Sequence, residues 1–236
     1  MINNSFIVTF SGIDGSGKSQ YIILLRRFLR RQGISYLYIH SVNDSLTNRL
    51  VRKFPKFKNI IGPKENEQNK KNLADSSNRP RKIKKISAFS SFIRFFILFL
   101  DALYLRLRMI SYNKNYQVII FDRYIYDKLV HIAYLRNKKI LPFSYFWLKI
   151  FPKANLSFYL QVLPEDALER KPEMKMEGQD IKYLNKKYQL FEEGKMIWKL
   201  REIRTSGTSI SEAKKKIISL FKKRFFRFLK IKKSHD

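Results

Sequence analysis

Eight residues near the amino end have the types and spacing of a phosphate-binding loop. They are Gly12, Ile13, Asp14, Gly15, Ser16, Gly17, Lys18 and Ser19. The run is a full match to G-x-x-x-x-G-K-[ST], in which glycines let successive backbone amides turn toward one anion at a helix start. We expect Lys18 to meet the β- and γ-phosphates of a nucleotide and the Ser19 hydroxyl to coordinate Mg²⁺. The pattern therefore predicts a site for ATP and magnesium.

A second candidate group closes a later hydrophobic run. Residues 118–121 read Val-Ile-Ile-Phe and are followed directly by Asp122 and Arg123. A carboxylate that ends a buried strand beside a phosphate loop can hold Mg²⁺, directly or through water. Turn chemistry alone also places aspartate at strand ends, but next to a phosphate loop we favour the metal role. Arg123 can bind a second phosphate, with a surface ion pair as the alternative.

A third group of charges lies at residues 163–173, which read Leu-Pro-Glu-Asp-Ala-Leu-Glu-Arg-Lys-Pro-Glu. Pro164 with Glu165 and Asp166 in the following turn predicts the start of a helix. Arg170 and Lys171 would then direct cations at the strand ends. A basic segment that closes over ATP would shield the charge that develops during phosphoryl transfer. A solvated helix end is the alternative interpretation.

Alternating strands and helices must position these groups. Short apolar runs predict five strands, at 5–11, 36–40, 117–121, 156–162 and 200–204. Helical spacing of apolar residues follows the phosphate loop and returns at 86–112. This alternation predicts an α/β fold of the P-loop NTPase type, a three-layer sandwich whose mostly parallel five-stranded sheet has helices on both faces.

Two segments differ from the rest in composition. Residues 52–85 are rich in Lys and Asn and poor in apolar side chains, which predicts a basic, partly disordered insertion within a domain of residues 1–212. Residues 213–236 carry apolar side chains at helical spacing among ten Lys or Arg residues. That tail predicts either a final amphipathic helix whose first half packs on the domain, or a basic aromatic segment lying on anionic lipid.

Composition narrows the possible classes of function. Lys and Arg total 49 against 19 Asp and Glu, a formal charge of +30, which favours polyanionic partners such as nucleotides, nucleic acid or an anionic membrane surface. The absence of cysteine excludes disulfides, thiolate zinc sites, iron–sulfur clusters and a cysteine nucleophile. The first ten residues do not have the pattern of a signal peptide, and charges interrupt the apolar stretch at 86–110. We therefore expect a cytoplasmic protein.

Three motifs together resemble the thymidylate kinase family. They are FSGIDGSGKS at 10–19, FDRY at 121–124 and VLPEDALERK at 162–171. The resemblance implies a homodimeric kinase in which Asp14 faces the acceptor nucleotide, Arg123 contacts the transferred phosphate and Arg170 leads into a closing lid. It also implies a small loop near adenine at residues 205–207, formed by Thr205, Ser206 and Gly207.

The acceptor half departs from the family pattern. An Arg-x-Pro-Gly-Gly-like loop follows the second strand in the family, whereas residues 40–45 read His-Ser-Val-Asn-Asp-Ser here. A base-binding arginine of the family is replaced by Leu-Asp-Ala at 100–102, and residues 125–128 replace its thymine-binding positions. Because of these differences, the sequence does not identify the acceptor substrate. The motifs expected to bind ATP match the family better.

Two functions are compatible with these observations. The first is an ATP- and Mg²⁺-dependent phosphotransferase acting on a nucleoside monophosphate, dTMP-like, or on a related small anion. Its expected catalytic residues are Lys18, Arg123 and Arg170, its metal ligands Ser19 and Asp122, and its acceptor-binding residues Asp14, Arg123 and Tyr124. The second is a nucleotide-binding accessory protein whose basic segments engage membrane or nucleic acid.

Overall fold

The computed structural model describes residues 5–40, 88–137, 139, 144–172 and 181–234. The insertion expected at 52–85, the segment at 41–45 and residues 173–180 after the expected lid helix lie outside the described residues.

Five strands form one parallel sheet in the order β2-β3-β1-β4-β5. The strands are β1 (Phe6–Ser11), β2 (Tyr36–His40), β3 (Val118–Asp122), β4 (Leu156–Gln161) and β5 (Arg201–Arg204). Every residue of β1 and β3 is buried, because a central parallel strand is covered on both faces, and such strands are continuous apolar runs. The α/β P-loop NTPase fold predicted from the alternation of strands and helices is confirmed.

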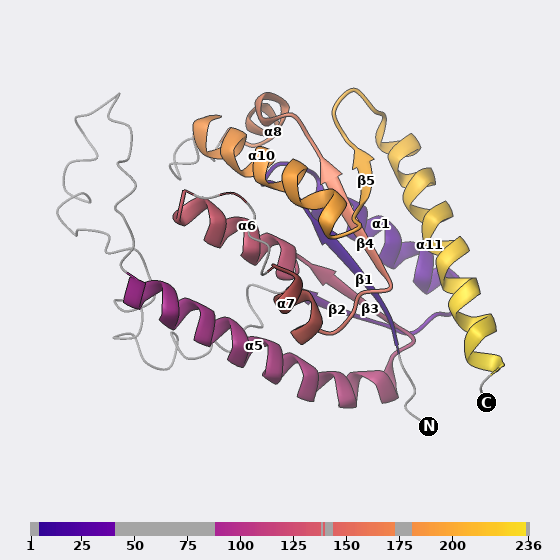
Figure 1. Ribbon diagram of the computed structural model, residues 1–236. Helices are drawn as coiled ribbons and strands as arrows, with labels where there is room; N and C mark the ends of the chain where they lie inside the picture. The colour runs from indigo at the N-terminus through magenta and orange to yellow at the C-terminus, as the bar shows by residue number, and fades with distance from the viewer. Residues whose placement is uncertain (1–4, 41–87, 138, 140–143, 173–180, 235–236) are drawn as a thin grey trace.

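Helices cover both faces of this sheet (Figure 1). On one face lie α1 (Lys18–Arg31) and α11 (Ile210–Lys233). On the other lie α5 (Ala88–Asn115), α6 (Ile125–Leu135), α7 (Ser144–Ile150), α8 (Pro164–Arg170) and α10 (Ile181–Ile197). As expected, α8 begins at a proline and has Glu165 and Asp166 in its first turn. Two apolar cores result, one on each face of the sheet.

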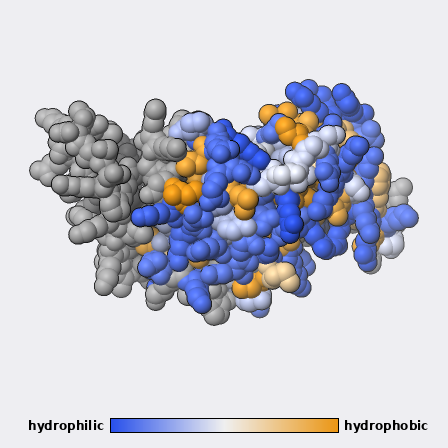
Figure 2. Space-filling model, turned by 90° about the horizontal axis from the view of Figure 1, so that it is seen from above, coloured by the Kyte–Doolittle hydropathy of each residue, from blue (hydrophilic) through white to orange (hydrophobic). Residues whose placement is uncertain are grey.

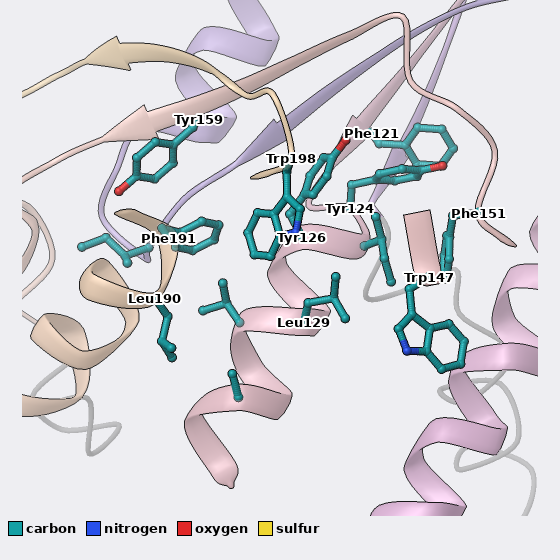
Figure 3. Packing of buried hydrophobic residues seen from close by; sticks show 14 of the residues in the cluster. Phe121, Tyr124, Tyr126, Leu129, Trp147, Phe151, Tyr159, Leu190, Phe191 and Trp198 are labelled. Atoms are coloured by element: carbon teal, nitrogen blue, oxygen red, sulfur yellow. The ribbon is translucent and has the colours of Figure 1, made fainter. Parts of the chain in front are cut away.

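The core beneath α5, α6 and α10 is rich in aromatic side chains (Figure 3). The Tyr159 and Phe191 rings stack with their centroids 5.1 Å apart and join β4 to α10. Tyr126 and Trp198 approach to 5.5 Å and join α6 to the end of α10. The Tyr126 hydroxyl is also 3.0 Å from Ser157 Oγ, so its polar end is satisfied inside the core. This packing fixes α6 and α10 against the sheet.

A buried ion pair joins α5 to α6. Asp101 is 7% exposed and accepts a hydrogen bond of 2.7 Å from Lys128 Nζ. The pair supplies the partner that a carboxylate on an apolar helix requires. Among the described residues, no helix is both long enough and apolar enough to cross a bilayer.

The carboxyl-terminal helix α11 packs over the core for most of its length. Phe221 and Phe225 are 1% and 3% exposed, and their rings lie 5.7 and 5.4 Å from that of Phe6 on β1. Ser209 caps the helix by accepting a hydrogen bond from the Glu212 amide. Of the two interpretations of the tail, the packed helix is the one observed for the buried side of α11, and contact of its exposed basic side with anionic lipid stays a prediction.

Two alanine substitutions on α11 test this packing. Phe221→Ala removes a buried ring that packs against Phe6 on β1 and Phe28 on α1, and it should lower the free energy of unfolding by about 3–5 kcal/mol. Phe226→Ala, on the exposed side of the same helix, is the matched control and should change it by less than about 0.5 kcal/mol. Urea denaturation followed by circular dichroism measures both. Equal effects of the two variants would contradict the packing described for α11.

Candidate functional site

The carboxyl ends of all five strands meet at one edge of the sheet, because every pairing is parallel. The arrowheads of β4 and β5 point to this edge in Figure 1, and Figure 2 views the molecule from that side and shows a largely hydrophilic surface. The loops that follow β1, β3, β4 and β5 carry the charged and polar groups singled out in the sequence. Ligands of open α/β sheets bind at this edge.

The phosphate loop has the backbone conformation that its glycines predict. Gly12, Gly15 and Gly17 all have positive φ, at 149°, 83° and 84°. Gly17 is the residue before α1, and that helix has neither an acidic residue in its first turn nor a side-chain cap. The first amides of a helix have no partner within it, so the start of α1 presents N–H donors and a positive dipole end to an anion.

Lys18 lies folded over the loop. Its Nζ donates hydrogen bonds of 2.8 Å to the carbonyl oxygens of both Gly12 and Ile13, and it lies 3.3 Å from Ser16 Oγ. Burial and, after it, the charge of Arg123 lower the pKa of Lys18 to about 8, although Asp14 and other carboxylates oppose both effects. An ammonium in this environment is stabilised by an anion, which is what the loop is built to receive.

Asp122 lies buried at the end of β3, beside the phosphate loop. Its register partner on β1 is Phe10, two residues before Gly12. The Tyr38 hydroxyl on β2 donates a hydrogen bond of 3.0 Å to Asp122 Oδ2. Burial, and to a lesser extent the negative charge of Asp122, raises the pKa of Tyr38 to about 12. Tyr38 therefore orients the carboxylate and stays protonated at neutral pH.

Asp122 and Ser19 supply the kinds of oxygen ligand that Mg²⁺ prefers. Asp122 supplies a hard carboxylate oxygen, and the exposed Ser19 supplies a hydroxyl at the start of α1. The described residues contain no cluster of three or more Asp, Glu, His or Cys that could hold a metal. Mg²⁺ commonly uses one or two protein ligands and completes its shell with phosphate oxygens and water, so this pair fits that ion.

Asp14 and Arg123 form an ion pair across the loop. Burial alone would raise the pKa of Asp14, but the cations of Arg123, Lys18 and Lys187 hold it below its usual value. Arg123 has a φ of 65°, and its amide donates a 2.9 Å hydrogen bond to the Phe10 carbonyl. A left-handed conformation is costly for a non-glycine residue, and such strain gathers at functional sites.

Asp127 is a site residue that the sequence analysis missed. One of its carboxylate oxygens accepts a 3.0 Å hydrogen bond from the Tyr124 amide at the start of α6, and the other lies 3.5 Å from the Gly12 amide. Asp127 therefore links the first glycine of the phosphate loop to α6. The position of Asp127 in the first turn of α6 could have predicted its capping role from the sequence. Its contact with Gly12 could not be predicted, because that contact depends on the tertiary fold.

Lys187 on α10 is the second site residue that was missed. The side chain is 8% exposed, and its Nζ lies 4.5 Å from the centroid of the Tyr183 ring. Burial lowers the pKa of Lys187, Asp14 opposes that effect and Arg123 adds to it. Within the part of the chain that the structure describes, Nζ makes no hydrogen bond. Nothing local in the sequence distinguishes Lys187 from the other lysines of α10.

Arg170 and the expected adenine loop lie together on the β5 side of the edge. Arg170 donates a 2.6 Å hydrogen bond to the Thr205 carbonyl, and its second amino group lies 3.3 Å from Thr205 Oγ1. Ser206 Oγ accepts a 2.8 Å hydrogen bond from the Leu163 amide, and Gly207 turns the chain with a φ of 65°. The structure thus brings Arg170 to residues 205–207, so α8 and this loop form one unit.

Tyr124 does not face the site. Its side chain is 2% exposed, its hydroxyl donates to the Pro152 carbonyl, and its ring packs 5.0 Å from Phe121 and 5.8 Å from Phe151 (Figure 3). The prediction that Tyr124 binds substrate is wrong, because the chain turns after Arg123 and directs the tyrosine into the core. Its neighbour Arg123 is the residue of this motif that reaches the loop.

Comparisons with known proteins establish the fold. No protein-family profile matches the chain, and no curated protein matches it in sequence. Among solved structures the chain is similar to thymidylate kinase from Candida albicans, with a TM-score of 0.60 at 16% identity, over 93% of this chain and 92% of that one. At this identity the likeness shows a thymidylate kinase-like, P-loop kinase fold.

The environment of Lys187 predicts that its charge reduces stability. We expect Lys187→Met to raise the free energy of unfolding at pH 7 by on the order of 1 kcal/mol, because a thioether of similar length replaces a poorly solvated ammonium. Since the pKa of Lys187 is lower in the folded state, its cost is fully present below that pKa and disappears as the pH passes the unfolded value of about 10.4.

The difference between variant and wild type should therefore be largest at neutral pH and close to zero at about pH 11. Urea denaturation across this range measures it, with Lys182→Met on the exposed side of α10 as the control. A variant that is less stable than wild type at pH 7 would show that Lys187 serves packing.

Proposed function

We propose that this protein is an ATP- and Mg²⁺-dependent phosphotransferase whose acceptor is a small phosphorylated molecule, a nucleoside monophosphate of the dTMP type. One observation carries the proposal: the segments after β1 and β3 present two separate cations that both act on Asp14, Lys18 in a phosphate loop and Arg123 in an ion pair. A protein that only binds a nucleotide needs the first; transfer to a phosphorylated acceptor needs both. The thymidylate kinase-like fold supports this proposal.

On the donor side, the loop amides and Lys18 hold the β- and γ-phosphates of ATP. Lys18 exchanges its hydrogen bonds to the Gly12 and Ile13 carbonyls for phosphate oxygens, and its charge opposes the negative charge that develops on the bridging oxygen. Ser19 and Asp122 hold Mg²⁺, with Asp122 oriented by Tyr38. When bound, Mg²⁺ neutralises phosphate charge and aligns the β- and γ-phosphates.

On the acceptor side, Arg123 positions the phosphate that attacks. Its guanidinium turns from Asp14 to the acceptor phosphate, and Asp14 is then free to accept a hydrogen bond from another part of that molecule. Lys187 lies close enough to influence the pKa of Asp14, and it adds a second positive charge to the same space. These groups bring an oxygen of the acceptor phosphate close to the γ-phosphorus and partly neutralise the negative charge of that acceptor phosphate. Positioning and charge neutralisation are the main tasks of a protein in phosphoryl transfer.

The reaction forms one bond and breaks one. An oxygen of the acceptor phosphate bonds to the γ-phosphorus of ATP as the bond to the bridging oxygen breaks, and ADP leaves with that electron pair. The Arg170 side chain is the moving part: it is held to Thr205 and turns toward the transferring phosphoryl group when ATP and the acceptor bind.

The test is ADP release measured by a coupled assay across a panel of nucleoside monophosphates that includes dTMP. We expect at least one acceptor to raise turnover well above the rate with water. Lys18→Ala should lower that turnover by about 100-fold or more, because it removes a charge aimed at the transition state. Lys182→Ala, an exposed lysine of α10, is the control. ADP release that no acceptor accelerates would favour the accessory nucleotide-binding protein instead.

Lys187 provides a separate prediction about the acceptor. Lys187→Met should raise KM for the best acceptor by about tenfold and leave KM for ATP within about twofold, because the charge of Lys187 acts on Asp14 and Arg123 and is not among the charges that shift the pKa of Lys18. Steady-state kinetics with each substrate varied in turn distinguish the two constants. A rise in KM for ATP alone would place Lys187 on the donor side.

A further inference from the structure

The two faces of the sheet carry very different charge. Helices α1 and α11 together contain fifteen Lys or Arg and one acidic residue, Glu212, in 38 residues. The five helices of the opposite face contain eleven Lys or Arg and seven Asp or Glu in 70 residues. A uniform bias of composition would charge both layers alike. The asymmetry therefore marks the outer surface of α1 and α11, which we call the basic face.

The cations in the second half of α11 point outward. On α11, the side chains of Lys222, Lys223, Arg224, Arg227 and Lys230 are all exposed. In the described part of the chain, none of these five forms an ion pair with an acidic residue. So many like charges repel one another, and an anionic surface outside the protein would relieve that repulsion.

An exposed aromatic ring lies in the middle of these charges. Phe226 is 56% exposed, whereas Phe225 beside it is buried in the core. Neighbours on a helix surface are three and four residues apart, so Lys222, Lys223 and Lys230 surround Phe226 on the outer side of α11. A large apolar side chain among cations is the arrangement with which amphipathic helices sit in the headgroup region of a membrane.

Helices α1 and α11 lie side by side and make one surface. The Phe28 ring on α1 contacts Phe221 at 6.1 Å, and Lys222 Nζ lies 5.2 Å from the centroid of the same Phe28 ring. With 24 and 14 residues, the two helices are about 36 and 21 Å long. The exposed Arg27 and Arg31 on the second half of α1 extend the charge of α11 across this layer.

We propose that the basic face docks on an anionic phospholipid bilayer, with its Lys and Arg on the headgroups and Phe226 at the boundary of the acyl chains. These residues are exposed and lie outside the stripe of α11 that contains the buried Phe221 and Phe225, so packing and docking use different side chains. Nucleic acid is the less favoured partner. Single strands are held by several stacked aromatic rings along a groove, whereas Phe226 is the one exposed aromatic among the described residues of α1 and α11.

Docking leaves the carboxyl edge of the sheet accessible. The phosphate loop precedes α1, whereas the exposed arginines of α1 lie in its second half, Arg27 being nine residues and about 13 Å beyond Lys18. Nucleotide binding and membrane docking are therefore separable, and the proposal does not depend on the catalytic function.

The experiment is co-sedimentation of the full chain with vesicles of phosphatidylcholine, with or without about 30 mol % phosphatidylserine. We expect binding to the anionic vesicles alone, and its loss at about 0.5 M NaCl, because the headgroup contacts are electrostatic. The triple variant Lys223→Glu, Arg224→Glu, Arg227→Glu should weaken binding by at least about tenfold. Phe226→Ala should weaken it about threefold or more with an unchanged salt dependence.

The matched control reverses three exposed charges on other parts of the surface: Lys149→Glu, Lys153→Glu and Lys182→Glu. It has the same net charge as the triple variant of α11 and should keep most of the binding. Circular dichroism and ATP binding check that both variants fold. Equal losses in the two triple variants would overturn the proposal, as would binding to DNA without binding to the anionic vesicles.

Discussion

The phosphate loop depends on a close approach of its glycines to neighbouring backbone. A Cβ atom on Gly12 would lie 2.6 Å from the Leu160 carbonyl oxygen, and one on Gly15 would lie 2.5 Å from that of Ala167. Both obstacles are main chain, of β4 and of α8, so neither can rotate away. The loop is therefore seated between the central strand, its neighbour and α8, and this seating places the start of α1 at the carboxyl edge of the sheet.

The position of the phosphate loop brings charged side chains of opposite sign together at the carboxyl edge of the sheet. Three cations from three parts of the chain, Lys18, Arg123 and Lys187, all act on the pKa of Asp14 at the edge. The two lysines are destabilised as cations by burial, and Asp14 is held ionised by the cations around it. Such an arrangement costs stability without a ligand and favours the binding of phosphate. The remaining positive charge of the molecule lies mainly elsewhere, on the outer layer of α1 and α11.

Local patterns predicted the strands to within one residue at each end, because a buried parallel strand is a short continuous apolar run. The conformation of the phosphate loop was also predictable from the sequence, because its glycines adopt the positive φ angles that the loop requires. Side-chain direction was less predictable. Tyr124 follows Arg123 directly, yet one side chain enters the core and the other faces the loop. The left-handed backbone conformation of Arg123 directs its own side chain to the phosphate loop and the Tyr124 side chain into the core. No local pattern of residue types predicts that conformation.

The sequence by itself determined the α/β architecture, the phosphate loop and the chemistry of Lys18, because each depends on residues adjacent along the chain. Only the tertiary structure placed Lys187 beside Asp14, 173 positions away, and Asp127 beside Gly12. It also decided which of the adjacent Phe225 and Phe226 on α11 is buried, because packing on the sheet alone distinguishes two neighbouring rings of the same type. Contacts between distant segments arise from packing, and periodicity in one segment does not encode them.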